Sequence, residues 1–157
     1  MHGALGQLRA TEAIEPLIAL FHDVVDDWNN FDLPKALGLI GGDAIPPLTK
    51  YIADSSREDY QRFAAASCFF YLAENYPDLR DKCVSVLTQQ LESFAVNGQE
   101  FNAILVDELV KLKAVESLSV IKKAFSRRKV DTLLMGNWND VQVGLRLKTW
   151  EEVYLDN

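Results

Sequence analysis

Residues 36–48 read Ala-Leu-Gly-Leu-Ile-Gly-Gly-Asp-Ala-Ile-Pro-Pro-Leu, which is the composition of a turn between two helices. Gly41 and Gly42 permit the left-handed backbone that ends many helices, and Asp43 can cap the helix that follows. Pro46 falls in the first turn of that second helix, where a missing amide proton costs little. The stretch therefore predicts one helix that ends before Gly41 and another that begins after Asp43.

The same pattern recurs along the chain. Residues 5–17 match residues 37–48 after one deletion in the turn, at an offset of 31 to 32 residues, and they match residues 109–121 without a gap. A degenerate copy lies at residues 71–79. The average step is about 35 residues, within the range of helical-pair repeats. We therefore expect four helix-turn-helix junctions.

Apolar residues around these turns recur every three or four positions, as in Phe63, Ala66 and Phe70, which is the spacing of one helical face. No two alternating runs are joined by an Asn-Gly or Asp-Gly hairpin turn. The pattern predicts an all-α fold, with Phe63, Phe70, Leu72 and Leu87 in the core. Helices are expected near residues 13–28, 32–40, 44–53, 58–75, 78–93, 99–112 and 115–128.

The beginning of the chain departs from this repeat. Leu5 and Gly6 have the form of the end of a second helix, but the first part of such a helix does not precede them. We therefore expect residues 1–10 to be the remainder of a helix in a chain that starts inside a repeat. An end of this kind exposes apolar edges, so self-association through it is plausible.

The repeat pattern also stops after Asp131, where a different segment with Trp138 and Trp150 begins. Terminal repeats are atypical because they close an open core with a polar outer face. We expect a single domain over residues 1–157, with repeats over 1–130. Residues 131–157 are expected to form a C-terminal cap, with a partner-binding segment as the alternative.

Composition argues against several classes of function. The net charge is −7, and a negative protein repels the phosphate backbone of nucleic acids. No apolar run approaches the roughly 20 residues of a membrane helix, and the N-terminus lacks the features of a secretory signal. Cys68 and Cys83 are too few for a disulfide framework. We expect a cytoplasmic protein that binds neither nucleic acid nor membrane.

Catalytic and metal-binding chemistry finds little support in the sequence. His22 and Asp26 could hold one edge of a metal ion, but a stable site needs three or four ligands. A cysteine nucleophile would need a histidine partner, and Cys68 stands among apolar residues typical of a core. The sequence therefore predicts no catalytic residue, no metal and no cofactor.

A cluster of cations lies near the end of the helix expected at residues 115–128. Cations in the last turn of a helix stabilise its carbonyl end, and we expect this structural role for the cluster. The alternative is a site that binds phosphate. The cluster consists of Lys122, Lys123, Arg127, Arg128 and Lys129.

Residues 4–8 with 12–18, and again residues 36–41 with 44–48, resemble HEAT repeats of the phycobilisome-lyase-like class. In that class a leucine-glycine pair closes the second helix of one repeat, and an Ala-Ile-x-x-Leu run opens the first helix of the next. Residues 62–66 are similar to the arginine and paired alanines of its second helices.

This resemblance extends from residue 4 to about residue 128. It implies a right-handed α-α superhelix, an armadillo-type solenoid of about four helical pairs, and it carries no catalytic group. The leading hypothesis is a non-catalytic bacterial scaffold or adaptor that binds a protein or peptide. The alternative is a bilin lyase-like or chaperone subunit that acts on chromophore-bearing proteins, so lyase-like activity stays open.

Second helices line the concave side of HEAT-type solenoids, so the resemblance implies a binding surface on the helices near residues 32–40, 58–75 and 99–112. Their polar positions make that surface acidic and rich in tyrosine, which favours a basic partner. Gln61 and Asn102 are also expected among the exposed positions. The candidate partner-binding residues are Glu58, Tyr60, Tyr71, Glu74, Asp107 and Glu108. The alternative is that the rings of Tyr60 and Tyr71 pack between helices.

Overall fold

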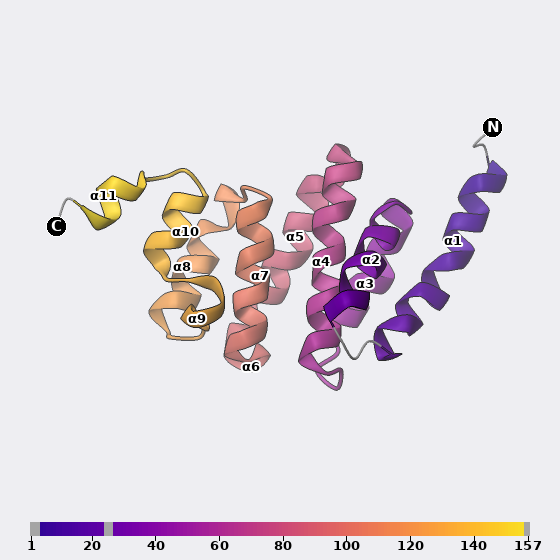
Figure 1. Cartoon of the computed structure of the whole chain (residues 1–157), viewed down its shortest axis with the longest axis horizontal. Helices are drawn as coiled ribbons and strands as arrows, with labels where there is room; N and C mark the ends of the chain where they lie inside the picture. Colours follow the sequence, from indigo (N-terminus) through magenta and orange to yellow (C-terminus); the bar gives the residue numbers. More distant parts are fainter. Residues whose placement is uncertain (1–3, 24–26, 156–157) are drawn as a thin grey trace. The chain divides into compact units, whose positions relative to one another are not determined.

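The computed structural model of the chain describes the backbone of residues 4–23 and 27–155, and the side chains of residues 11–21 and 33–155. It is 80% helical and contains no strand in those backbone ranges, which confirms the all-α class (Figure 1). Within the same ranges no helix has both the length and the apolarity needed to cross a bilayer. The chain divides into two compact units, Met1–Cys83 and Val84–Asn157.

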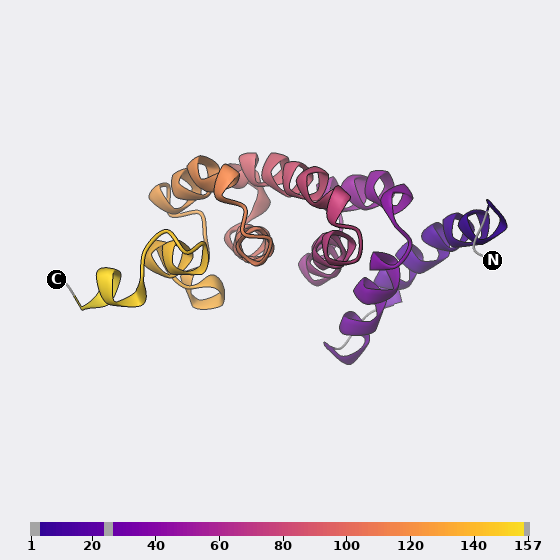
Figure 2. The ribbon, with the colours of Figure 1, turned by 90° about the horizontal axis from the view of Figure 1, so that it is seen from above.

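In the first unit, helix α4 is the element against which α2 and α3 pack. In the view of Figure 2, these helices lie in two layers, with α3 in one layer and α4 in the other. The elements of this unit are α1 (Ala4–Ala19), η1 (Leu20–Asp23), α2 (Asp27–Gly38), η2 (Gly42–Ala44), α3 (Ile45–Ala53), α4 (Asp59–Asn75) and η3 (Pro77–Leu79).

The turn predicted around the paired glycines is confirmed. Gly41 has a φ of 102°, in the region that favours glycine, and the 3-10 turn η2 leads directly into α3. Pro46 lies at the start of α3, where it removes no helical hydrogen bond. Asp43 does not cap α3 as expected, because it lies inside η2 and the N-cap of α3 is Ala44. Its carboxylate instead accepts a hydrogen bond from the Thr11 hydroxyl of α1 at 3.1 Å.

The matching turn expected within residues 5–17 does not form. Helix α1 runs without interruption from Ala4 to Ala19 and includes Pro16. Residues 7–15 contain no glycine and are mostly good helix formers, so nothing there stops the helix. The next helix is therefore displaced to Asp27–Gly38. The exposed edge expected at residues 1–10 lies outside the described side chains.

The closest approach between helices occurs at the end of α2. A Cβ atom added to Gly38 would lie 2.4 Å from Cβ of Tyr71 and 3.0 Å from its carbonyl carbon. Beside this contact, the Asn75 side chain donates a hydrogen bond to the Gly38 carbonyl at 2.9 Å, and the Tyr76 hydroxyl donates to the Leu39 carbonyl. The C-terminal end of α2 is thus fixed to that of α4.

The predicted core was half correct. Leu72 and Leu87 are fully buried. Phe63 and Phe70 are only half-buried, because the buried face of α4 is the opposite one, which carries Phe69. Periodicity identifies the members of one helical face, but only the neighbouring helices decide which face they cover.

The second unit is arranged around α7. Helices α6, α9 and α10 all contact α7, and α11 contacts α10. The boundary with the first unit falls inside α5. The remaining elements are α5 (Arg80–Glu92), α6 (Phe94–Asn97), α7 (Gln99–Lys111), η4 (Val115–Ser117), α8 (Leu118–Ser126), α9 (Thr132–Met135), α10 (Trp138–Gly144) and α11 (Trp150–Tyr154).

The segment after Asp131 packs against the preceding helices. The Lys113 ammonium donates a hydrogen bond to the Gly144 carbonyl at 2.9 Å. A Cβ added to Gly144 would lie 2.7 Å from a methyl group of Val110, so α10 sits close to α7. Its assignment as a cap stays a prediction.

We predict that Gly38→Ala destabilises the protein, although alanine ordinarily favours a helix. The added methyl group would collide with backbone and Cβ atoms of Tyr71, which cannot move aside as a flexible side-chain tip could. Overpacking of this kind costs about 1–3 kcal/mol. Urea denaturation followed by circular dichroism measures the change in the free energy of unfolding.

Gly42→Ala is the matched control, because a Cβ at Gly42 would meet only the Leu79 side chain, at an ordinary 3.6 Å. Equal stability of the two alanine variants would contradict the close approach of α2 and α4.

Candidate functional site

One face of α4 is less buried than the rest of the helix. Its residues recur at intervals of three or four, so they form a continuous strip along the helix. Tyr60 and Glu74, near the two ends, are exposed, and the residues between them are half-buried. This strip, the α4 stripe, consists of Tyr60, Phe63, Ser67, Phe70, Tyr71 and Glu74.

Buried Arg62 holds the start of α4 against the end of α3. Its side chain is 4% exposed and donates two hydrogen bonds to the Ile52 carbonyl, from Nε at 3.0 Å and from Nη2 at 2.7 Å. The last carbonyls of a helix lack partners within it, so the guanidinium satisfies one that burial would otherwise leave costly. Burial also lowers the pKa of Arg62.

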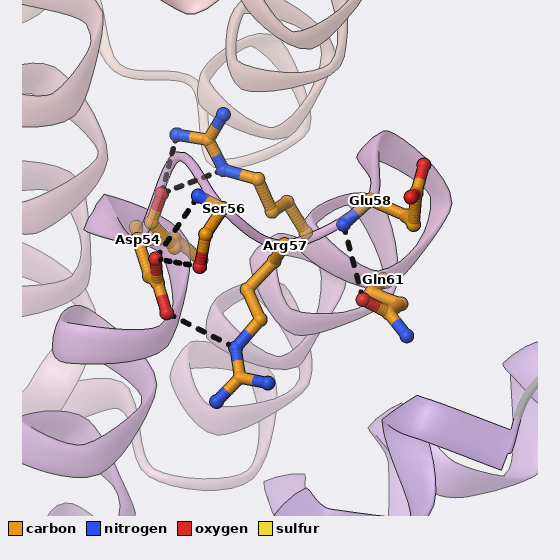
Figure 3. A network of polar contacts seen from close by, with 7 residues as sticks. Asp54, Ser56, Arg57, Glu58 and Gln61 are labelled. Atoms are coloured by element: carbon orange, nitrogen blue, oxygen red, sulfur yellow. Dashed lines mark hydrogen bonds and ion pairs between the residues drawn. The ribbon is translucent and has the colours of Figure 1, made fainter.

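The loop between α3 and α4 is closed by a second set of polar contacts (Figure 3). The Asp54 carboxylate accepts hydrogen bonds from the Ser56 hydroxyl at 2.6 Å and the Ser56 amide at 3.0 Å, and these bonds lower the pKa of Asp54. Arg57 Nε lies 3.1 Å from the same carboxylate, and its guanidinium lies 4.9 Å from the centre of the Tyr51 ring. The loop is therefore ordered up to the first residue of α4.

Four of the six predicted partner-binding residues lie on α4 or directly before it. Glu58 is exposed and precedes the helix, where its amide donates to Gln61 Oε1 at 3.1 Å. Tyr60 and Glu74 are exposed, whereas Tyr71 is half-buried and packs edge-on against Phe70 at 5.4 Å between ring centres. The structure thus places these four residues along one helix, with Tyr71 partly used in packing.

The other two predicted residues lie on α7 in the second unit. Asp107 is half-buried and Glu108 is 2% exposed, so Glu108 was wrongly expected at the surface. Both carboxylates pair with the Lys111 ammonium, at 3.3 and 3.1 Å. Burial lowers the pKa of Lys111, but the charges of Glu108 and Asp107 outweigh it and leave that pKa raised. These two acids neutralise a lysine of their own helix.

Gln61 and Asn102 were also expected to be exposed, and both are buried. Each amide is used inside the protein: Gln61 accepts from the start of α4, and Asn102 donates to the Phe94 and Lys129 carbonyls. Helical spacing alone treats such amides as surface residues, because it contains no information about loop carbonyls that they can reach.

Phe63 and Phe70 are members of the α4 stripe that sequence reasoning assigned to the core. Their spacing from Tyr60 and Glu74 could have identified them, since positions 60, 63, 67, 70, 71 and 74 lie on one face of a helix. The stripe therefore combines four aromatic side chains with a terminal acid.

A small pocket lies beside the same loop. It has a volume of about 210 Å³ and is lined by residues of α1, α3 and the α3–α4 loop. Pockets for drug-sized ligands usually have about 300–1,000 Å³. This pocket is therefore large enough for a side chain or a few waters rather than for a cofactor.

Neither cysteine is placed for nucleophilic chemistry. Cys68 and Cys83 are both buried and unlinked, and burial raises the pKa of Cys83 to about 11. The reactive form of cysteine is the thiolate, so this shift makes Cys83 a weak nucleophile at neutral pH. Within residues 11–21 and 33–155 no cluster of metal-binding side chains occurs. The proposed His22–Asp26 pair lies outside the described side chains.

Comparison with known proteins gives one match. The family model for the PBS lyase HEAT-like repeat matches residues 3–23, the region of α1 and η1. No curated protein and no solved structure matches the chain.

We predict that Arg62→Lys lowers the free energy of unfolding by about 1–2 kcal/mol. Lysine keeps the charge but cannot direct two donors at the Ile52 carbonyl, and hydrogen bonds of charged groups contribute about 1.5–3 kcal/mol. Urea denaturation measures the change.

Arg57→Lys is the control, because the side chains of Arg57 and Asp54 are both more than one-third exposed, and ion pairs between exposed groups contribute little. The account of Arg62 fails if the two lysine variants lose the same stability.

Proposed function

We propose that this chain, which is a HEAT-like repeat protein, is a non-catalytic scaffold that binds a basic protein segment along the α4 stripe. The observation that carries the proposal is the stripe itself: exposed or half-buried aromatic rings in one line, with Glu74 at its far end and exposed Glu58 just before the helix begins. Helical repeat proteins commonly bind partners on such extended helical surfaces.

The aromatic residues supply the contact area in this proposal. Tyr60 is 40% exposed, and its ring can contribute area at a low entropic cost because it has few rotatable bonds. Tyr71 and Phe70 already support each other edge-on. Because α4 is held by Arg62 at its start and by the α2 contact near its end, binding requires little reordering of the scaffold.

The acidic residues set the charge of the partner. Glu74 on α4 and Glu58 directly before α4 are exposed and stand 16 residues apart, which corresponds to about 24 Å at the helical rise. An extended segment of about seven residues spans that distance. The best-fitting partner is therefore an extended segment with a lysine or arginine near each end and apolar residues between them.

The same proposal includes the arrangement of the helices, the location of the protein and the kinds of partner that it does not bind. The resemblance to HEAT repeats supports a right-handed solenoid of about four helical pairs, whose second helices face the partner. A cytoplasmic location and the absence of nucleic-acid and membrane partners are in keeping with the net charge of −7. Self-association through the N-terminal end is a further possibility for such a repeat array.

The second candidate function is a bilin lyase-like or chaperone role on chromophore-bearing proteins. The description of the matched family favours it, since the repeat at residues 3–23 is of the PBS lyase type. The buried cysteines offer no support for covalent catalysis by the chain itself. A role of this kind would therefore depend on holding the chromophore-bearing protein.

We predict that Glu74→Lys slows the association of a basic peptide. The probe is a fluorescein-labelled nine-residue peptide with two lysines near each end and leucines between them. Reversing one exposed charge should reduce the association rate about fivefold at low salt, and added salt should shrink the difference. Stopped-flow fluorescence anisotropy measures this rate.

Glu92→Lys is the matched control, because Glu92 is equally an exposed helical glutamate but lies on α5, and the change in net charge is the same. An association rate that falls equally in both variants reports only total charge and overturns the role of the stripe.

For the second candidate, we predict that co-expression with a pigment source and a phycobiliprotein subunit yields no coloured adduct that depends on this chain. Absorbance and zinc-enhanced fluorescence of the denatured subunit measure covalent attachment. Pigment that attaches only when this chain is present would overturn the non-catalytic assignment.

A further inference from the structure

A second charged surface, of opposite sign, lies at the end of α8. Four of its cations are exposed, and Lys129 is half-buried. Among the residues that the structure describes, none of the five is paired with a carboxylate. This surface, the α8 basic end, consists of Lys122, Lys123, Arg127, Arg128 and Lys129.

The loop that carries the last three of these cations is fixed to the start of α7. The Gln99 side chain donates to the Arg128 carbonyl at 2.8 Å, and the Asn102 side chain donates to the Lys129 carbonyl at 2.8 Å. Asn102 is fully buried and is itself held by Asn97 at 2.9 Å. The cations are thus presented from an ordered backbone, which lowers the entropic cost of binding.

Arg128 occupies a backbone conformation that glycine adopts more easily. Its φ is 57°, and the hydrogen bonds from Arg128 to Phe125 and from Lys129 to Ala124 are those of a helix-ending Schellman turn. Glycine is the common residue at this position because it has no Cβ. The arginine is therefore not explained by the backbone, and its charge is available for another role.

Two exposed leucines follow the α8 basic end closely in the chain. Leu133 is 97% exposed and Leu134 is 56% exposed, and both belong to α9, which follows the loop (Figure 1). The acid nearest to them in sequence, Asp131, caps α9, because its carboxylate accepts hydrogen bonds from the Leu133 and Leu134 amides at 2.9 and 3.3 Å. Exposed cations and exposed aliphatic side chains thus follow one another within residues 122–134.

We propose that the α8 basic end and the Leu133–Leu134 pair form a docking surface for a protein segment rich in acidic and aliphatic residues. The cations select the carboxylates by charge, and the leucines take the aliphatic side chains. Nucleic acid is a poorer fit, because its backbone offers nothing to exposed leucines and the whole chain carries a net charge of −7. This surface is separate from the α4 stripe and selects a partner of opposite charge.

The test uses a fluorescein-labelled ten-residue peptide of six aspartates and four leucines, with the aspartates replaced by asparagine in a second peptide. Binding to the full chain is measured by fluorescence anisotropy at low and moderate salt. A labelled single-stranded oligonucleotide of similar length is measured in parallel.

The variant Arg127→Gln with Arg128→Gly removes two cations and places glycine at the left-handed position. We expect it to be at least as stable as the parent chain and to bind the acidic peptide about tenfold more weakly. The matched control is Arg146→Gly with Lys148→Gln, which also removes two exposed cations and relieves a left-handed arginine with a φ of 60°. That control should bind normally.

Replacing Leu133 and Leu134 with serine should weaken binding of the acidic peptide without changing oligonucleotide binding. The proposal is overturned if the acidic peptide does not bind better than its asparagine counterpart, or if both cation-depleted variants lose the same affinity. It is also overturned if the oligonucleotide binds more tightly than the acidic peptide.

Discussion

The packing of α2 against α4 at Gly38 is the constraint on which the first unit depends. The two backbones approach so closely there that a methyl group does not fit, and hydrogen bonds from Asn75 and Tyr76 hold the same ends together. This contact decides which face of α4 is covered. The face that is left less buried is the α4 stripe, whose member Tyr71 borders this contact, so the candidate binding surface is a consequence of helix packing.

Arg62 has the complementary role at the other end of α4. A buried guanidinium is costly unless its donors are satisfied, and the Ile52 carbonyl satisfies two of them. The same contact removes an unsatisfied carbonyl at the end of α3. One side chain therefore joins α3 to α4 and fixes the position from which Glu58 and Tyr60 extend. Arg62 is structural, whereas Glu58 and Tyr60 beside it are exposed.

The sequence was most informative where backbone chemistry leaves few choices. The paired glycines at residues 41–42 identified a real turn, because few other residues tolerate that conformation. Residues 5–17 matched the same pattern in their apolar positions but lack the glycines, and they form one continuous helix. The burial of Glu108 and Phe70 was predicted wrongly, because burial depends on neighbouring residues and periodicity contains no information about them. For Glu108 the neighbour is a lysine one turn away, and for Phe70 burial depends on which face of α4 packs.

The central claim is that the α4 stripe is a binding surface, and an NMR titration tests it most directly. Backbone amide shifts of the labelled full chain would be followed while the unlabelled lysine-leucine peptide is added. The account predicts saturable changes in the amide shifts along α4, at Tyr60, Ser67, Tyr71 and Glu74. The amide shift of Phe69, on the buried face of α4, should change little. Saturable changes confined to other helices, with the stripe unchanged, would contradict it.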